Sequence, residues 1–215
     1  MIDIRQQEEL LMAVGKMLPK KMVVYAIGGT AMMLLGIKNS TLDIDFIFER
    51  KEERKEFMEA LKKLGAKSYD NALAYGTKEN IPLMLEFGNS RFDMFLDKVV
   101  SSVFSKSMKE RARQAHEFGN LIVKVAEPSD IMLMKSATSR EKDAEDIIAV
   151  ISRHIVDWNA LVEEAQEQVK LGNETAILYL GEKLELLARR KAIALPKGVL
   201  DKLWTLLHRQ VKRKH

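Results

Sequence analysis

Apolar side chains near the start of the chain follow first a helical and then a strand-like spacing. Residues 6–18 carry leucine, valine and methionine at positions i, i+3, i+4 and i+7, which predicts an amphipathic helix. Residues 22–27 form a β-branched and aromatic run that is too short for a helix, so they predict a buried strand stopped by Gly28-Gly29. A short helix over 31–35 is expected to follow this turn.

Strict alternation marks residues 41–48, where leucine, isoleucine and phenylalanine alternate with Asp43 and Asp45. A period of two predicts a strand with both carboxylates on one face. A charged amphipathic helix is expected over 49–64. Two further strands are expected over 82–87 and 91–96, joined by a loop of hairpin length, and Asp93 lies in the middle of the second strand.

The pattern changes near Pro128. A strand is expected over 121–125, after a charged segment at 106–118, whereas a run of helical segments follows Pro128. These helices are expected over 128–137, 144–155, 158–171, 173–190 and 197–211. The chain is therefore expected to be an α+β protein with two parts: a mixed β-sheet flanked by helices over 1–127, and a helical C-terminal region over 128–215.

Composition removes several classes of protein. The 215 residues include no cysteine, which excludes disulfides, thiolate zinc sites, iron–sulfur clusters and cysteine nucleophiles. Charged residues interrupt every long apolar stretch well before the roughly 20 residues that cross a bilayer. The first residues are polar and acidic, unlike a signal peptide, so we expect a soluble protein in the cytoplasm with no membrane partner.

The net charge of +4 is small and permits anionic ligands without requiring them. The most basic segment is the C-terminal end, Arg209-Gln210-Val211-Lys212-Arg213-Lys214. It could contact phosphates of a nucleic acid. The interpretation that we favour is a solvated helix end, where cations oppose the negative pole of the helix dipole.

Three features of the first part indicate phosphate chemistry when taken together. Gly28-Gly29 allows backbone to approach a phosphate closely, and the helix start after it offers unpaired N–H groups. Asp43 and Asp45 place two like charges on one strand face, which favours a cation between them. Magnesium prefers such carboxylate oxygens, and Asp93 could complete a two-metal site. The alternatives are a tight glycine turn and an edge strand whose carboxylates face solvent.

This combination resembles the polymerase-beta-like nucleotidyltransferase superfamily. The stretch Ile27-Gly28-Gly29-Thr30-Ala31 followed by Thr41-Leu42-Asp43-Ile44-Asp45-Phe46 is most similar to its minimal prokaryotic branch, which contains the abortive-infection type toxins. The segments Pro128-Ser129-Asp130 to Lys135 and Arg140-Glu141-Lys142-Asp143 to Ile147 are similar to the helical segment of that branch. The resemblance implies a nucleotidyltransferase-like sheet in the first part of the chain.

Roles for individual residues come from this resemblance alone. Gly28, Gly29 and Thr30 would hold the β and γ phosphates of an NTP, and Asp43, Asp45 and Asp93 would bind Mg²⁺ or Mn²⁺. Asp93 would also help activate the acceptor hydroxyl, and Lys135 would neutralise the triphosphate. Asp143, with Arg140 or Lys142, would order the far wall of the site. The alternative for this last set is an exposed helix face with charge pairs such as Arg140 with Asp143.

The implied activity is a magnesium-dependent transfer of a nucleoside monophosphate from an NTP, ATP among them, to an acceptor hydroxyl. The acceptor would be a tRNA, a protein or a small molecule, and the basic tail favours RNA. The resemblance also implies a toxin role with an antitoxin partner. The alternative is a non-catalytic module on the same fold that binds nucleotide or a partner protein.

Overall fold

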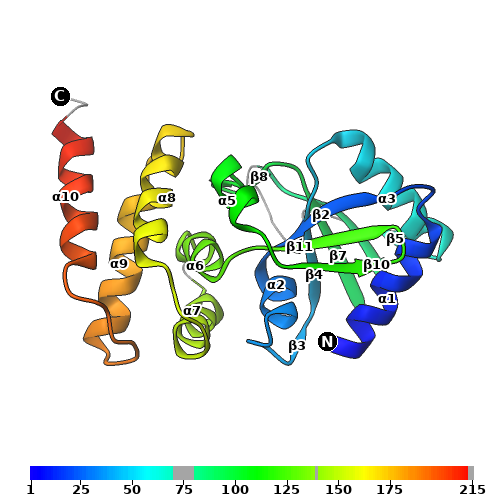
Figure 1. The fold of residues 1–215 in the computed structure, drawn as a ribbon, viewed down its shortest axis with the longest axis horizontal. Coiled ribbons are helices and arrows are strands. Elements are labelled where there is room, and N and C mark those ends of the chain that lie inside the picture. Colours follow the sequence, from blue (N-terminus) through cyan, green and yellow to red (C-terminus); the bar gives the residue numbers. More distant parts are fainter. Residues whose placement is uncertain (70–79, 139, 213–215) are drawn as a thin grey trace. The chain divides into compact units, whose positions relative to one another are not determined.

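The fold is described from a computed structural model, which covers residues 1–69, 80–138 and 140–212. The chain divides into two compact units, Met1–Ala126 and Glu127–His215, and each has a core of its own (Figure 1). Of the basic C-terminal segment, Arg213 and Lys214 lie outside the described residues.

The first unit is built on a mixed sheet. Within the described residues, seven strands join in the order β10-β11-β2-β4-β7-β6-β5 (Figure 1). Their bounds are β2 Met22–Ala26, β4 Asp43–Ile47, β5 Lys67–Ser68, β6 Leu83–Phe87, β7 Ser90–Phe95, β10 Ala115–Phe118 and β11 Leu121–Val125. Strand β4 runs antiparallel to β2 and parallel to β7. Because β4 is an interior strand, Asp43 and Asp45 are not on a sheet edge.

Helices and short strand pairs complete the first unit. The helices are α1 Ile4–Met17, α2 Gly28–Leu34, α3 Lys51–Lys63 and α5 Lys106–Arg111, and the two-residue strands are β1 Ile2–Asp3, β3 Ser40–Thr41, β8 Lys98–Val99 and β9 Ser102–Val103. Helix α1 begins with a capping box, in which Asp3 accepts from Gln6 N–H and the Gln6 side chain accepts from Asp3 N–H. Strand β1 pairs with β3 just before this cap.

The two faces of the sheet differ in chemistry. On one face, Phe46 and Phe48 of β4 and Phe92 of β7 contact Phe57 of α3, with ring centroids 5.2 to 6.0 Å apart. All four rings are fully buried, so this face with α3 is the apolar core. Strand alternation places Tyr25, Asp43, Asp45, Arg91, Asp93 and Lys124 on the opposite face, which we call the polar face.

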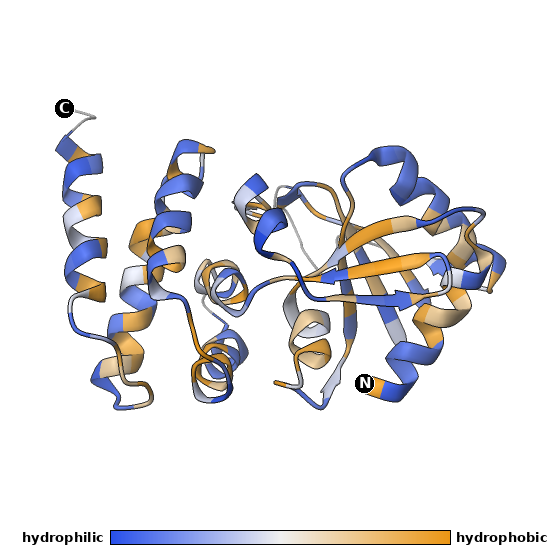
Figure 2. Cartoon of the chain, in the orientation of Figure 1, coloured by the Kyte–Doolittle hydropathy of each residue, from blue (hydrophilic) through white to orange (hydrophobic). Residues whose placement is uncertain are grey.

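The second unit is helical. Its helices are α6 Pro128–Ser136, α7 Glu141–Arg153, α8 Trp158–Lys170, α9 Ala176–Arg189 and α10 Val199–Lys212. Apolar and hydrophilic residues alternate around these helices in Figure 2, as expected for helices that bury one side. Gly181 of α9 allows close packing against α10, because a Cβ there would lie 2.6 Å from the Trp204 ring.

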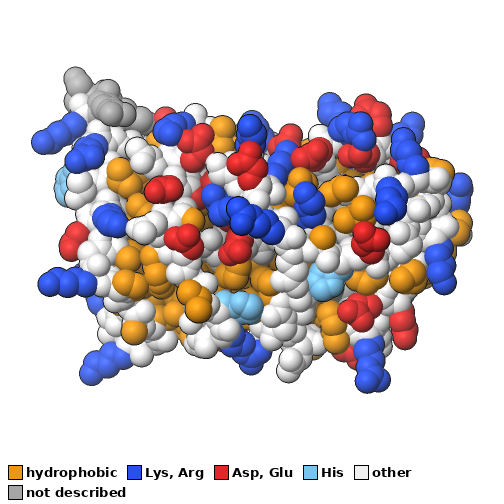
Figure 3. Space-filling view, in the orientation of Figure 1, with side chains coloured by type: hydrophobic (Ala, Val, Ile, Leu, Met, Phe, Trp, Pro, Cys, Tyr) orange, Lys and Arg blue, Asp and Glu red, His pale blue; other side chains and the backbone are white. Residues whose placement is uncertain are grey.

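The expected α+β class is confirmed: a mixed sheet flanked by helices is followed by a helical C-terminal region. Helix α5 and strand β10 form within the charged segment 106–118, for which no element was predicted. Acidic and basic side chains are interspersed on the face of the molecule seen in Figure 3. None of the helices in the described residues is long and apolar enough to cross a membrane.

Candidate functional site

The Gly28-Gly29-Thr30 segment lies at the start of α2, directly after β2. The helix therefore begins three residues earlier than the sequence predicts, and Ile27 rather than Thr30 occupies the N-cap position. The reason lies in the Thr30 hydroxyl, which accepts from Asp45 N–H at 2.8 Å and donates to the Asp43 carbonyl at 3.4 Å. Thr30 is fully buried and joins α2 to β4.

Both glycines are required by close approaches to neighbouring side chains. Gly28 has φ +54°, and a Cβ there would lie 2.7 Å from the Asp45 Oδ2 atom. A Cβ at Gly29 would lie 2.5 Å from the Thr41 hydroxyl. The start of α2 therefore lies directly against the Asp45 carboxylate. This places the glycines and one of the predicted metal ligands in a single site.

The structure brings the predicted carboxylates to one region of the polar face. Asp45 of β4 and Asp93 of β7 are register partners on adjacent parallel strands, and Asp43 precedes Asp45 by two residues on the same face. Asp93 is fully buried, whereas Asp43 and Asp45 are partly exposed. A buried carboxylate requires charged or hydrogen-bonding partners.

Arg91 supplies such a partner. Its Nε atom lies 2.9 Å from Asp93 Oδ1, and its Nη2 atom lies 2.9 Å from Asp43 Oδ2. The guanidinium also lies 5.5 Å from the centroid of the Tyr69 ring, in cation–π geometry. Arg91 therefore bridges two of the three carboxylates. Our sequence analysis did not identify it, although it stands two residues before Asp93 and so had to share its face.

The donor chemistry of this region suits a hard divalent cation, because every candidate ligand is a carboxylate oxygen. The contact of Arg91 with Asp43 and Asp93 shows that positive charge is needed there. No group of three or more acidic or histidine side chains is close enough to hold a metal ion, within the ranges that the structure describes. Metal binding by Asp43, Asp45 and Asp93 stays a prediction, and it requires the Arg91 side chain to move.

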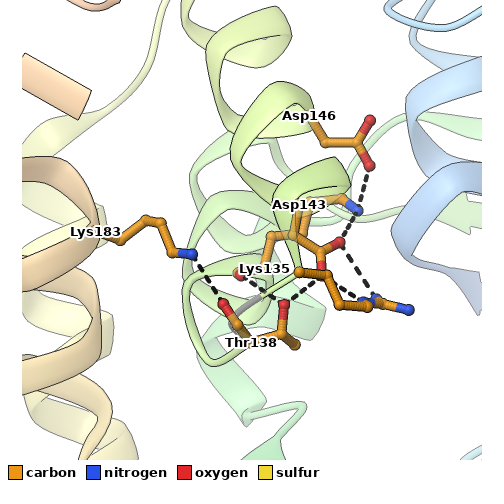
Figure 4. Close-up of polar contacts among 6 residues, drawn as sticks. Lys135, Thr138, Asp143, Asp146 and Lys183 are labelled. Atoms are coloured by element: carbon orange, nitrogen blue, oxygen red, sulfur yellow. Dashed lines mark hydrogen bonds and ion pairs between the residues drawn. The ribbon is translucent and has the colours of Figure 1, made fainter. Parts of the chain in front are cut away.

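Lys135 and Asp143 belong to the second unit. Lys135 of α6 lies between two carboxylates of α7, with Nζ 3.0 Å from Asp143 Oδ1 and 2.6 Å from Asp146 Oδ2 (Figure 4). All three side chains are nearly buried. The ammonium is thus already neutralised within its own unit. Its predicted role on a triphosphate stays a prediction.

Asp143 is held from several sides. The Thr138 hydroxyl donates to Oδ2, and Arg140 Nε lies 2.7 Å from the same atom. Burial alone would raise the pKa of Asp143, but Lys135, Thr138 and Arg140 together lower it to about 2. The Lys183 ammonium of α9 donates to the Thr138 carbonyl at 2.9 Å (Figure 4). The cluster therefore joins α6, α7 and α9, and the Arg140–Asp143 pair expected under the alternative interpretation is present.

Comparisons with known proteins give the family. No curated protein matches the chain significantly. The crystal structure of ANT(2″)-Ia in complex with adenylyl-2″-tobramycin is 14% identical, with a TM-score of 0.46, over 83% of this chain and 97% of that one. A crystal structure of an antigenic nucleotidyltransferase-like protein from Paracoccidioides brasiliensis is 16% identical, with a TM-score of 0.49, over 92% of this chain and 98% of that one. A family model matches residues 2–178, well over half of the chain. The chain belongs to the family described as "Nucleotidyltransferase of unknown function (DUF6036)".

Proposed function

We propose that this chain transfers a nucleoside monophosphate from an NTP to an acceptor hydroxyl. The acceptor oxygen bonds to the α-phosphorus, the bond from that phosphorus to the bridging oxygen breaks, and pyrophosphate leaves. One observation carries the proposal: Asp45 and Asp93 are register partners on the polar face, and Gly28 lies against Asp45. Membership of a nucleotidyltransferase family supports it.

The residues of the polar face have distinct tasks in this reaction. Gly28 and Gly29 have no side chains and so leave space for the β and γ phosphates beside the start of α2. Asp43, Asp45 and Asp93 would hold one or two divalent ions, Mg²⁺ or Mn²⁺. When bound, such ions neutralise the developing charge and orient the phosphates. Asp93 would accept the proton of the attacking hydroxyl at one of its carboxylate oxygens.

A toxin role, an antitoxin partner and membership of the abortive-infection branch rest only on the motif resemblance. Transfer to tRNA, to a protein or to a small molecule are equally compatible with the polar face. Lys135 and Asp143 enter the proposal through their motif positions. The carboxylates of the polar face therefore provide the sharpest test of the activity.

The test is transfer of label from each α-³²P-labelled NTP, with Mg²⁺ or Mn²⁺, to total RNA, to protein and to small-molecule acceptors. The variant Asp45→Asn keeps the size of the side chain and removes its charge. Asp201→Asn, an exposed position in α10, is the matched control. We expect Asp45→Asn to lower the transfer rate by about a hundredfold or more, while the control retains it. Equal transfer by both variants would show that the polar face is not the active site.

A second candidate function is a nucleotide-binding or partner-binding regulatory module without catalysis. The observation that favours it is Arg91, whose guanidinium already neutralises Asp43 and Asp93. This candidate predicts that NTP binds to the wild-type protein but that no acceptor becomes labelled under any condition of the screen. Labelling that depends on Asp45 excludes it.

A further inference from the structure

A second feature of the first unit is a pocket of about 440 Å³ on its surface. This volume lies within the range of small-ligand pockets, roughly 300–1,000 Å³. We call it the basic pocket, because most of its lining side chains are cations. The lining residues are Tyr25, Glu49, Lys106, Lys109, Glu110, Ala112, Arg113 and Lys124.

The basic pocket opens on the same sheet face as the carboxylates. Tyr25 of β2 pairs with Lys124 of β11 on one side and with Ile47 of β4 on the other. Ile47 follows Asp45 by two residues on β4, a rise of about 6.8 Å. A ligand in the basic pocket would therefore lie one side-chain row away from Asp45 and Asp93.

Some of the charge in the pocket is already neutralised. The Lys109 ammonium lies 2.8 Å from Asp97 and 3.5 Å from Glu49, so this lysine is part of the wall. Lys106 lies 3.7 Å from Glu110, but both side chains are mostly exposed, and such pairs are weak. Lys106 therefore remains available to an incoming anion.

Arg113 and Lys124 provide further positive charge. Neither forms an ion pair with any acidic group that the structure describes, and the Lys124 ammonium lies 5.9 Å from the centroid of the Tyr25 ring. Burial, followed by the Glu49 carboxylate that accepts from its hydroxyl, raises the pKa of Tyr25 to about 12. The tyrosine thus adds an uncharged ring to the pocket. A cationic pocket with an aromatic wall is suited to a phosphate attached to a sugar or a base.

We propose that the basic pocket binds a phosphate group of the acceptor, so that the acceptor is a phosphate-bearing molecule. This inference rests on the proposed function, because that reaction defines the acceptor. The separation along β4 places a hydroxyl close to the bound phosphate within reach of the carboxylates. A nucleic acid strand and a phosphorylated small molecule share this chemistry. Arginine and lysine contribute differently: Arg113 offers a planar pair of donors and Lys124 a point charge.

The test compares two double variants that remove the same charge from the same unit. Arg113→Gln/Lys124→Gln removes the two unpaired cations of the basic pocket. Lys55→Gln/Lys63→Gln removes two exposed cations from α3, which covers the opposite face of the sheet. Both variants lower the net charge by two, so long-range attraction of anions falls by a similar amount in each. The wild-type protein completes the set.

Three probes are titrated into each protein: inorganic phosphate, glucose 6-phosphate and a short single-stranded RNA with a fluorescent label. We expect the pocket variant to bind at least one probe about tenfold more weakly than the α3 variant. If RNA is the source of the phosphate, the slope of log K against log salt should also fall by about 1.4, which is 0.7 for each lost contact on a single strand. A loss confined to glucose 6-phosphate identifies a small phosphorylated acceptor.

The proposal is overturned if the pocket variant and the α3 variant bind all probes equally, or if the wild-type protein binds none of them. NTP binding is measured on the same three proteins. The pocket variant should bind NTP like the wild type, because the nucleotide lies at Gly28 and the carboxylates. Failure of NTP to bind to any of the proteins would count against the proposed function, whatever the result with the phosphate probes.

Discussion

Arg91 and Asp93 form a two-point contact on the polar face, with Nε 2.9 Å from Oδ1 and Nη2 3.4 Å from Oδ2. The Asp93 side chain is completely buried, and the Arg91 side chain is 23% exposed. A carboxylate removed from water in this way depends on its charged partner. The contact explains how an acidic strand face is tolerated beside an apolar core, and it identifies Arg91 as the group that an incoming metal ion would displace.

Replacing Arg91 should therefore weaken the fold. We expect Arg91→Met to lower the free energy of unfolding by about 3 kcal/mol, because Asp93 loses its partner while staying buried. Urea denaturation at neutral pH measures the change. The matched control is Arg189→Met, which removes a mostly exposed pair with Glu185 and should cost less than about 1 kcal/mol.

Divalent cations provide a second arm of this experiment. If the carboxylates bind metal, Mn²⁺ should restore more stability to Arg91→Met than it adds to the wild-type protein, since the guanidinium no longer competes. Equal stabilisation of both proteins by Mn²⁺ would show that Arg91 does not occupy the place of the metal.

Gly28 should be needed for its space as well as for its backbone conformation. Gly28→Ala introduces a Cβ 2.7 Å from Asp45 Oδ2, whereas Gly36→Ala meets no atom within 4 Å, and both glycines have positive φ. Each variant should lose about 1–2 kcal/mol of stability from the backbone. Only Gly28→Ala should also weaken NTP binding, measured by calorimetry. Parallel losses of NTP affinity in the two variants would refute this distinction.

Asp143 should make the protein sensitive to acid. Its pKa is lowered from an ordinary 3.8 to about 2, so its contribution to stability is complete above about pH 4 and is lost as the pH falls through 2. The loss is on the order of 2 kcal/mol, at 1.36 kcal/mol for each pKa unit. Unfolding free energies measured between pH 5 and pH 2 should fall less steeply in Asp143→Asn than in wild type. The same slope in both would contradict the shift.

Helix α1 should tolerate no side chain at Gly15. A Cβ there would lie 1.6 Å from the Phe118 carbonyl oxygen in the turn between β10 and β11. Gly15→Ala must displace backbone and should lower the free energy of unfolding by about 1–3 kcal/mol. Lys16→Ala, at the next and exposed position, should change it little. Thermal unfolding of the two variants and the wild type measures the difference.

Periodicity predicted most elements of the fold because one side of each is buried. The strand over 121–125 matches β11, and the expected helix over 158–171 differs from α8 by one residue. Helix α5 and strand β10 escaped prediction because the segment 106–118 is charged throughout and shows neither period clearly. The basic pocket is built partly from this segment, so it could not be found from the sequence.

The candidate site was predictable where it depends on strand alternation and not where it depends on pairing between strands. The shared face of Asp43 and Asp45 follows from their spacing. The register that places Asp45 beside Asp93 depends on the sheet order, which the sequence does not specify. The contacts of Lys135 with Asp143 and Asp146 likewise depend on how α6 packs against α7.

The most direct test of the central claim is binding of Mn²⁺, measured by electron paramagnetic resonance in the presence of NTP. The account predicts that wild-type protein and Asp201→Asn bind Mn²⁺ together with NTP, and that Asp45→Asn and Asp93→Asn do not. Mn²⁺ binding of the same strength in all four proteins would contradict the claim that the polar-face carboxylates form the nucleotide site.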